Sequence, residues 1–253
     1  MRNHLYVDGT DLATFGVYIS GDGTFSAPEK AYDWYDVPSK DGSVLGYERR
    51  LKNIKVSYDC FIYTNFDAQI AALRAFLLSR NGIVNINDSY HTGEFRRGVY
   101  SGPFDPSVER TLDAGKFVLT FDCLPQRWLT SGQTYTTITA PGSGSQSTTI
   151  PNTTQFAAAP VIRIFGTGRV RFGNVDITIS SNYPYSDMYI DSETMRCYYG
   201  GNTDVSSYVV FYDWLENVYG VDPPKIKPGG VAVTLYASES VSKIYVTPRW
   251  WTV

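Results

Sequence analysis

Two stretches of alternating side chains limit what this chain can fold into. Residues 54–60 read IKVSYDC and residues 117–123 read FVLTFDC. Apolar side chains fall on every second position in both, so an extended backbone places them all on one face. We therefore predict two half-buried β-strands, with Cys60 and Cys123 among the inward-facing residues.

Composition favours the same class of fold. Aromatic residues make up 15% of the 253 residues, and aromatic side chains are enriched in strands and at protein interfaces. Hydrophobic residues reach 43% and charged residues 19%, which supplies enough apolar material for a packed core. The chain is long enough for one large β domain or two ordinary ones.

One helix is predicted between the two strands, over about residues 67–80. Asn65 or Asp67 is expected to cap its first turn, and Asn81-Gly82 to end it. A helix of this length owes most of its stability to packing, so we expect it to lie on the sheet. Its apolar stripe consists of Ile70, Leu73, Phe76 and Leu77.

A change of composition suggests a domain boundary. Residues 134–152 are rich in Thr, Ser, Gly and Pro, and we interpret them as a linker, although a long loop within a sandwich would have the same composition. Short strand-like segments follow at the spacing of a β-sandwich. These are Val161 to Phe165, Val170 to Ile179, Met188 to Ile190, Val205 to Phe211, Val231 to Tyr236 and Ile244 to Thr247.

The predicted fold class is thus mainly β. Residues 1–133 form an N-terminal β-sandwich or α+β domain with one helix and a protruding hairpin. Residues 153–253 form a galectin-like, jelly-roll-like β-sandwich. The sequence leaves open whether the last strand, Ile244 to Val253, closes the second sandwich or returns to the first domain.

The protruding hairpin is predicted at about residues 31–52. Ser39-Lys40-Asp41-Gly42 separates two strand-like runs, and Asp-Gly is a strong turn signal. An isolated two-stranded ribbon is marginal in water, so this one must lean on its own sheet or on another subunit. An ordinary core hairpin is the simpler alternative.

Residues that could perform chemistry are scarce. The two histidines, His4 and His91, occur in no HExxH pattern, and no GxSxG motif is present. The three cysteines are far apart and form no CxxC pair, so we interpret them as reduced, buried thiols. We assign no catalytic, cofactor-binding or metal-binding residue, and we expect a protein that is not an enzyme.

Two pairs of residues offer alternatives to this expectation. Asp191 and Glu193 would share one face of a strand and could act as a glycosidase pair, a reading we rank last. Trp250 and Trp251 would point to opposite faces of a strand, one into the core and one toward a partner or a sugar ring. We take these two tryptophans as candidate partner contacts.

Charge and targeting signals exclude further classes. The net charge is -3 and no block of Lys or Arg occurs, so stable nucleic-acid binding is not expected. The first residues contain no apolar run of signal-peptide length, and no segment approaches a membrane span of roughly 20 residues. Synthesis in the cytoplasm is the expectation.

A series of short motifs then resembles a known family, the distal tail (Dit) proteins of siphoviruses that infect Gram-positive hosts, especially lactococcal phages. The similarity covers nearly the whole chain through the order and spacing of the motifs. One departure is Ser39-Lys40, where the family often has Gly-Arg. The matching motifs are Gly9 to Tyr18, Val37-Pro38 to Asp41-Gly42, Tyr58 to Phe61, Leu77-Leu78, Asp88-Ser89-Tyr90, Phe95-Arg96-Arg97, Phe121 to Leu129, Pro160 to Ile162, Gly166 to Gly168, Ile190 to Glu193 and Val246 to Trp251.

The resemblance implies a structural role in the virion. It implies a hexameric ring at the tail tip or baseplate, closed by a belt-like hairpin, with a lumen through which DNA passes during genome ejection. The implied partners are the tail tube protein, the tail-associated fibre or lysin protein, and baseplate or receptor-binding components. The ring-interface residues carried over are Trp34, Tyr35, Val37, Pro38, Ser39, Lys40, Asp41, Gly42, Tyr47, Arg49 and Arg50. A carbohydrate-binding module that contacts the host cell wall is the alternative function.

Overall fold

The computed structural model divides the chain into two compact units, residues Met1–Trp128 with Val253 and residues Leu129–Thr252. It describes residues 2–21, 23–103 and 105–253, and only the backbone at residues 47–49. Strands dominate both units, so the predicted mainly-β class is confirmed. Within the described part of the chain, α1 (Phe66–Leu78) is the single α-helix.

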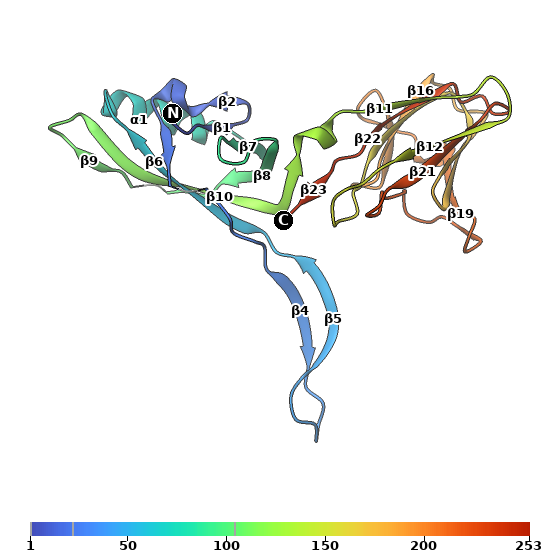
Figure 1. Cartoon of the computed structure of the whole chain (residues 1–253), viewed down its shortest axis with the longest axis horizontal. Coiled ribbons are helices and arrows are strands. Elements are labelled where there is room, and N and C mark those ends of the chain that lie inside the picture. The colour runs from blue at the N-terminus through green and yellow to red at the C-terminus, as the bar shows by residue number, and fades with distance from the viewer. Residues whose placement is uncertain (1, 22, 104) are drawn as a thin grey trace. The chain divides into compact units, whose positions relative to one another are not determined.

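The first unit is built on one antiparallel sheet in the order β2-β1-β7-β8-β10-β6-β3, with β9 also paired to β10 (Figure 1). A short 3-10 helix, Leu12–Phe15, precedes β3. The strands are β1 (Leu5–Val7), β2 (Thr10–Asp11), β3 (Tyr18–Ser20), β6 (Ile54–Ile62), β7 (Val84–Asp88), β8 (Glu94–Tyr100), β9 (Ser107–Glu109) and β10 (Ala114–Leu129).

The two alternating stretches pair with each other at the centre of this sheet. β6 and β10 run antiparallel without a register shift, from the pair Gly115–Ile62 to the pair Cys123–Ile54. Their inward side chains pack with α1 in one core, which includes Val56, Leu119 and Phe121. Their outward side chains leave the opposite face polar, where Ser57 Oγ and Thr120 Oγ1 lie 2.9 Å apart.

The helix begins in a different way from the prediction. Asn65 has a left-handed backbone, with φ of 49°, and its side chain makes no cap. The carboxylate of Asp113 instead accepts hydrogen bonds from Asn65 N at 2.8 Å and Phe66 N at 3.1 Å. Asp113 lies in the turn between β9 and β10, so the cap comes from a residue far along the chain. The expected caps Asn65 and Asp67 were wrong for this reason.

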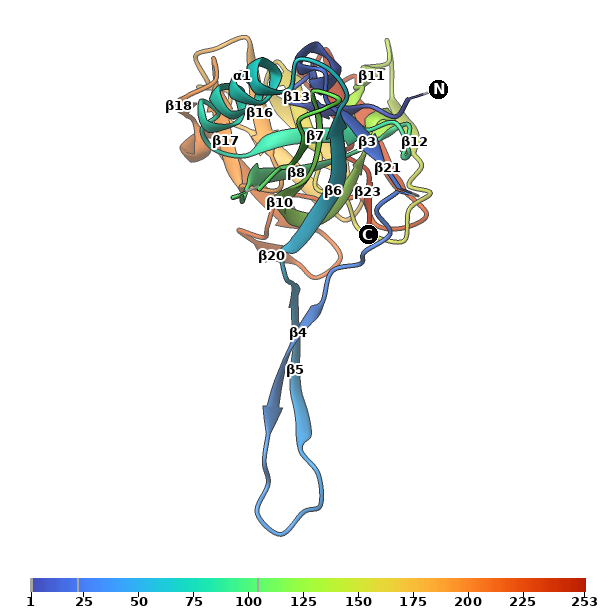
Figure 2. The same ribbon diagram turned by 90° about the vertical axis from the view of Figure 1, so that its left-hand side faces the viewer.

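The predicted hairpin is an extended arm, β4 (Lys30–Tyr35) paired with β5 (Val44–Leu51), which protrudes from the first unit (Figure 2). Its tip differs from a two-residue Asp-Gly turn. A β-turn closes earlier, where Lys40 N donates to Val37 O at 3.2 Å and Ser39 takes a φ of 67°. Asp36 and Ser43 then bond across the base of a longer loop, at 2.6 Å.

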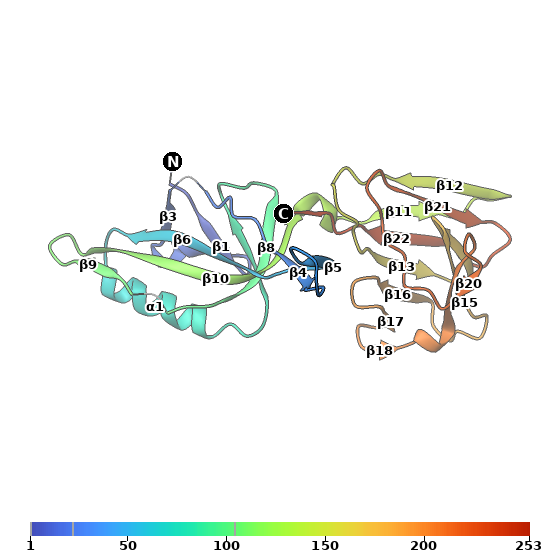
Figure 3. The ribbon, with the colours of Figure 1, turned by 90° about the horizontal axis from the view of Figure 1, so that it is seen from below.

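The second unit is a sandwich of two antiparallel six-stranded sheets (Figure 3). One sheet has the order β11 (Thr136–Thr139), β22 (Lys243–Thr247), β13 (Val161–Phe165), β16 (Asp187–Asp191), β17 (Arg196–Tyr199), β18 (Thr203–Asp204). The other has the order β12 (Ser145–Ile150), β21 (Val231–Tyr236), β14 (Gly168–Phe172), β15 (Val175–Ile179), β19 (Val209–Asp213), β20 (Val218–Tyr219). Two 3-10 helices, Thr130–Gln133 and Ser206–Tyr208, and the short β23 (Trp251–Thr252) complete the elements.

Residues 134–152 are not a linker. They contain β11 and β12, which pair with β22 and β21 at one edge of each sheet. Ile138 and Ile150 are buried in the core between the sheets, while the Thr and Ser residues around them are largely exposed. Edge strands with one solvated face tolerate such polar sequences, which is why composition suggested a linker here.

The chain end and the cysteines complete the account. β22 belongs to the second sandwich, whereas the short β23 that follows it pairs with β10 of the nine-stranded sheet. The predicted last strand, Ile244 to Val253, is thus divided between the two sheets. All three cysteines are free and buried, as predicted.

Candidate assembly interface

The arm presents large aromatic side chains that are more than half exposed in the described chain. Trp34 is 60% exposed and Tyr35 57% exposed, and both lie in β4. The Tyr32 ring lies tilted beside that of Trp34, with centroids 6.2 Å apart, and Val37 and Leu45 are also exposed. Soluble monomers seldom expose contiguous apolar surface of this kind without a partner. The arm is therefore the strongest candidate for an assembly interface.

The predicted interface residues all lie on this arm. Pro38, Ser39, Lys40, Asp41 and Gly42 form its exposed tip. Arg50 is exposed near the root of the arm in β5. The side chains of Tyr47 and Arg49 lie outside the described residues. Sequence reasoning did not select Tyr32 or Leu45, although both continue the aromatic and aliphatic pattern of the two strands.

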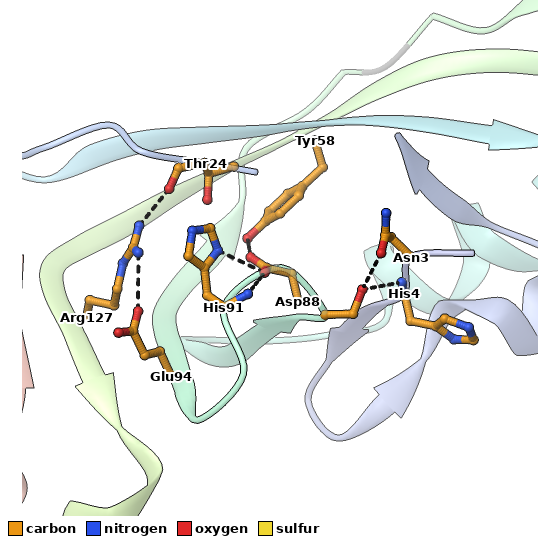
Figure 4. A network of polar contacts seen from close by, with 9 residues as sticks. Asn3, His4, Thr24, Tyr58, Asp88, His91, Glu94 and Arg127 are labelled. Carbon is orange, nitrogen blue, oxygen red and sulfur yellow. Dashed lines mark hydrogen bonds and ion pairs between the residues drawn. The ribbon is translucent and has the colours of Figure 1, made fainter. Parts of the chain in front are cut away.

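A polar network lies where the arm joins the sheet (Figure 4). Asp88, at the end of β7, accepts a hydrogen bond from Tyr58 OH at 2.9 Å and one from His91 N at 2.8 Å. His91 Nδ1 lies 2.9 Å from the same carboxylate. Burial raises the pKa of Tyr58 well above its usual value, and the neighbouring Asp88 charge adds to this rise.

Two arginines extend the network toward residues 24–26, which lead into β4. Arg127 Nη2 donates to Thr24 O at 2.7 Å, and its Nη1 lies 3.2 Å from Glu94 Oε2. Arg96 Nη2 donates to Ser26 O at 3.3 Å. Arg96 is only 3% exposed, and burial followed by repulsion from Arg127 lowers its pKa.

Sequence reasoning missed these arginines as site residues, although a signal for one of them existed. The alternation that places Phe117, Leu119, Phe121 and Cys123 inward reaches Arg127 in the same phase. A cation at a core position of a strand requires a buried partner. No comparable pattern singles out Arg96.

The carboxylate pair considered for catalysis has a structural environment. Asp191 ends β16, whereas Glu193 lies in the following turn, so the two do not share a strand face. Arg249 bridges them, with Nη1 at 3.0 Å from Glu193 Oε2 and Nη2 bonded to Asp191. Burial raises the pKa of Asp191, but the hydrogen bonds and charge of Arg249 and the backbone N–H groups of Glu193 and Thr194 together outweigh burial, so the net pKa is lowered. The ion pairs attach the turn to Arg249 near the end of the chain. They keep the Asp191 carboxylate ionised, which does not suit it to donate a proton.

The two terminal tryptophans are both partly buried. Trp250 packs against the core of the second unit. Trp251 stacks on Phe156 with centroids 4.2 Å apart and donates from Nε1 to Ala157 O at 3.0 Å. Neither is among the large hydrophobic residues that the second unit exposes. Those include Tyr219, which is 74% exposed, Leu215, Met195, Tyr135 and Trp214.

Across the described residues, no group of three or more His, Cys, Asp or Glu side chains is placed to hold a metal ion. No helix in the described ranges is long and apolar enough to cross a membrane.

Two solved structures are similar over nearly the whole chain. The Dit protein of phage SPP1, described as a paradigm of the hub adsorption apparatus in phages that infect Gram-positive hosts, is 16% identical with a TM-score of 0.65. The alignment covers 97% of this chain and 98% of that chain. A chain of the phage P2 baseplate in its activated, calcium-containing conformation is 10% identical with a TM-score of 0.50, again over 97% and 98%.

These similarities establish the fold. No protein-family model and no curated protein sequence matches the chain. The chain shares the fold of the SPP1 Dit protein and of this phage P2 baseplate chain, in agreement with the resemblance seen in its sequence motifs.

Proposed function

We propose that this protein is a structural hub of a siphovirus tail tip or baseplate, in which copies assemble into a ring through the arm. The single observation that carries the proposal is the exposed aromatic arm on a fold shared over its full length with the SPP1 hub protein. The proposal includes the hexameric state, the lactococcal-phage type, the lumen for DNA and the contacts with tube, fibre or lysin, and receptor-binding proteins.

Surface energetics support an intermolecular role for the arm. An isolated two-stranded ribbon gains too little from its own pairing to be stable in water. A standard interface buries about 800 Å² on each partner, and apolar burial contributes about 25 cal/mol for each Å². The exposed rings of Trp34 and Tyr35 supply the kind of side chain that dominates such interfaces.

The shape of the arm suits head-to-tail contacts in a ring. The arm leaves its own unit as a narrow ribbon, so a surface that receives it differs in shape from the arm itself (Figure 2). Contacts between two different surfaces repeat head to tail and close into a ring when the rotation allows. The net charge of -3 without a basic block suits a lumen that lets DNA pass without holding it.

The carbohydrate-binding alternative receives no support from the residues first considered for it. The ring of Trp251 is stacked on Phe156, and Trp250 packs against the core. We therefore retain the hub as the proposed function.

The test is the mass of the assembled protein. Wild-type chain is expected to form a ring-sized species in light scattering or native mass spectrometry, alone or with its tube partner. Trp34→Ser with Tyr35→Ser removes the two exposed arm rings and should leave a folded monomer. The matched control, Trp214→Ser with Tyr219→Ser, removes exposed aromatics of the second unit and should assemble normally. A wild-type protein that stays monomeric at high concentration and with its partners would refute the proposal.

A further inference from the structure

The two strands of the arm are attached to the first unit in different ways. β5 ends at Leu51 and β6 begins at Ile54, so the second arm strand continues almost directly into the central sheet. The first arm strand, β4, follows residues 23–29, which belong to no strand. Without a second attachment, the ribbon could swing about the short connection at residues 52–53.

The second attachment consists of hydrogen bonds from the buried Arg96 and the partly buried Arg127 to backbone carbonyls. Arg127 Nη2 contacts Thr24 O at 2.7 Å and Arg96 Nη2 contacts Ser26 O at 3.3 Å. These arginines lie on the neighbouring strands β10 and β8. Hydrogen bonds from a charged donor are stronger than neutral ones, and burial strengthens them further. We call Arg96, Arg127 and these two carbonyls the latch.

Side chains around the latch hold the same segment. The Phe25 ring packs edge-on against His91, with centroids 5.4 Å apart, although Phe25 is otherwise 78% exposed. His91 is in turn fixed by Asp88. Gly23 has a φ of 101°, and an added Cβ would lie 3.3 Å from His91 Cε1, so the chain passes close to the imidazole.

The buried Arg96 guanidinium is expected to lower the stability of the sheet, because its charge is incompletely paired. No carboxylate lies within ion-pair distance of it among the described residues, and its Nη1 has no hydrogen-bond partner there. Replacing an incompletely paired buried charge with an apolar residue of similar size is often neutral or stabilising. Stabilisation of the sheet therefore does not account for a guanidinium at this position, whereas its hydrogen bond to the segment that leads into the arm does.

We infer that the latch is a positioning device that fixes the direction of the arm, so that the arm meets a neighbouring copy in one orientation. This inference rests on the proposed function, since it assumes that the arm engages another copy. A ribbon held at both strands loses less conformational freedom on binding than one held at a single strand. Arg96 and Arg127 are then positioning residues for assembly, although neither lies on the arm.

The experiment measures the direction of the arm by electron-electron double resonance. Spin labels are placed at the tip by Lys40→Cys and on the exposed face of α1 by Ala71→Cys, in full-length protein diluted with unlabelled chain. The native cysteines are buried and remain unlabelled. Arg96→Met removes one latch contact, and Glu94→Gln with Arg127→Met removes the other without leaving the partly buried Glu94 carboxylate unpaired. Arg97→Met, at the adjacent and more exposed position of β8, is the matched control.

We expect a narrow distance distribution in the wild type and in Arg97→Met. Both latch variants should widen it about twofold or more, because a freed ribbon populates several orientations. The assembled fraction should fall in the same variants, while the urea midpoint of Arg96→Met stays at or above that of the wild type. Arg96→Lys should give a distance distribution narrower than that of Arg96→Met and wider than that of the wild type.

Distinct outcomes would overturn the inference. Distributions as narrow as the wild type in folded latch variants would show that the arginines do not hold the arm. Widened distributions with an unchanged assembled fraction would show that the latch does not contribute to assembly, and the proposed function would stand. If the double variant fails to fold, Arg96→Met and Phe25→Ser decide, since the Phe25 ring lies largely in solvent. A wild-type protein that never assembles contradicts the proposed function. The widths of the distance distributions would still show whether the latch fixes the direction of the arm.

Discussion

The arm and the β6–β10 ladder are both antiparallel pairs rich in aromatic residues, yet they have opposite relations to solvent. The ladder keeps one register along its length and buries every second side chain of β6 under the helix. The arm has register shifts between Lys30 and Tyr32 and between Asp33 and Trp34, and no residue with a described side chain in either of its strands is buried. Strand pairing is common to both, so burial of one face is what separates them.

This difference shows where the stability of the first unit comes from. Ladder hydrogen bonds exchange with water at little net gain, whereas removing apolar side chains from water is the dominant favourable contribution. The ladder is therefore stable within one chain. The arm has the pairing without the burial, and its aromatic surface is left for a partner.

The largest expected difference between the ladder and the arm is in the reactivity of their thiols. Burial raises the pKa of Cys60 to about 12 and that of Cys123 to about 11. Relative to an ordinary thiol of pKa about 8.5, the thiolate fraction at pH 8 falls roughly 240- to 2,400-fold. A cysteine introduced at the tip by Val37→Cys should therefore react with iodoacetamide faster by at least this factor. Native thiols that reacted at the rate of Val37→Cys would show that the ladder opens readily.

Truncation in the ladder should produce the next largest effect. Phe121 is fully buried, with edge-on ring contacts to Tyr58 and Tyr100. Phe121→Ala removes these contacts and leaves a cavity, so we expect it to lower the free energy of unfolding of the first unit by about 3–5 kcal/mol. Urea denaturation followed by far-UV circular dichroism measures the change. A loss below about 1 kcal/mol would mean that the ladder is not the stabilising centre.

Truncation in the arm should have the smallest effect on the isolated chain. Trp34→Ala removes a larger side chain than Phe121→Ala, but one that is already in solvent. The expected change in the free energy of unfolding of the monomer is within about 0.5 kcal/mol. The same urea experiment, performed at a concentration where the wild type is monomeric, provides the measurement. A loss as large as that of Phe121→Ala would mean that the arm folds back onto its own unit.

Much of the fold followed from local patterns. The alternation around Val56 and Leu119 predicted the two strands, and the apolar stripe of residues 70–77 predicted the helix within two residues of its bounds. The hairpin was predicted because Asp41-Gly42 separates two strand-like runs, although the turn itself closes at Val37–Lys40. Polar edge strands at residues 134–152 were mistaken for a linker, since one exposed face removes most of the alternating signal.

What the sequence by itself determined is which face of each element is apolar, because a side chain's periodicity depends only on its near neighbours. What only the tertiary structure decided is which distant groups meet. The carboxylate of Asp113 caps a helix 47 residues away at Phe66, and Arg127 reaches the carbonyl of Thr24 across 103 residues. Arg249 pairs with Asp191 in the same manner. Such contacts leave no periodic trace, since each depends on how the whole chain folds back. The arm illustrates both cases. Its strands could be predicted from the sequence, whereas the contacts that attach it to the sheet could not.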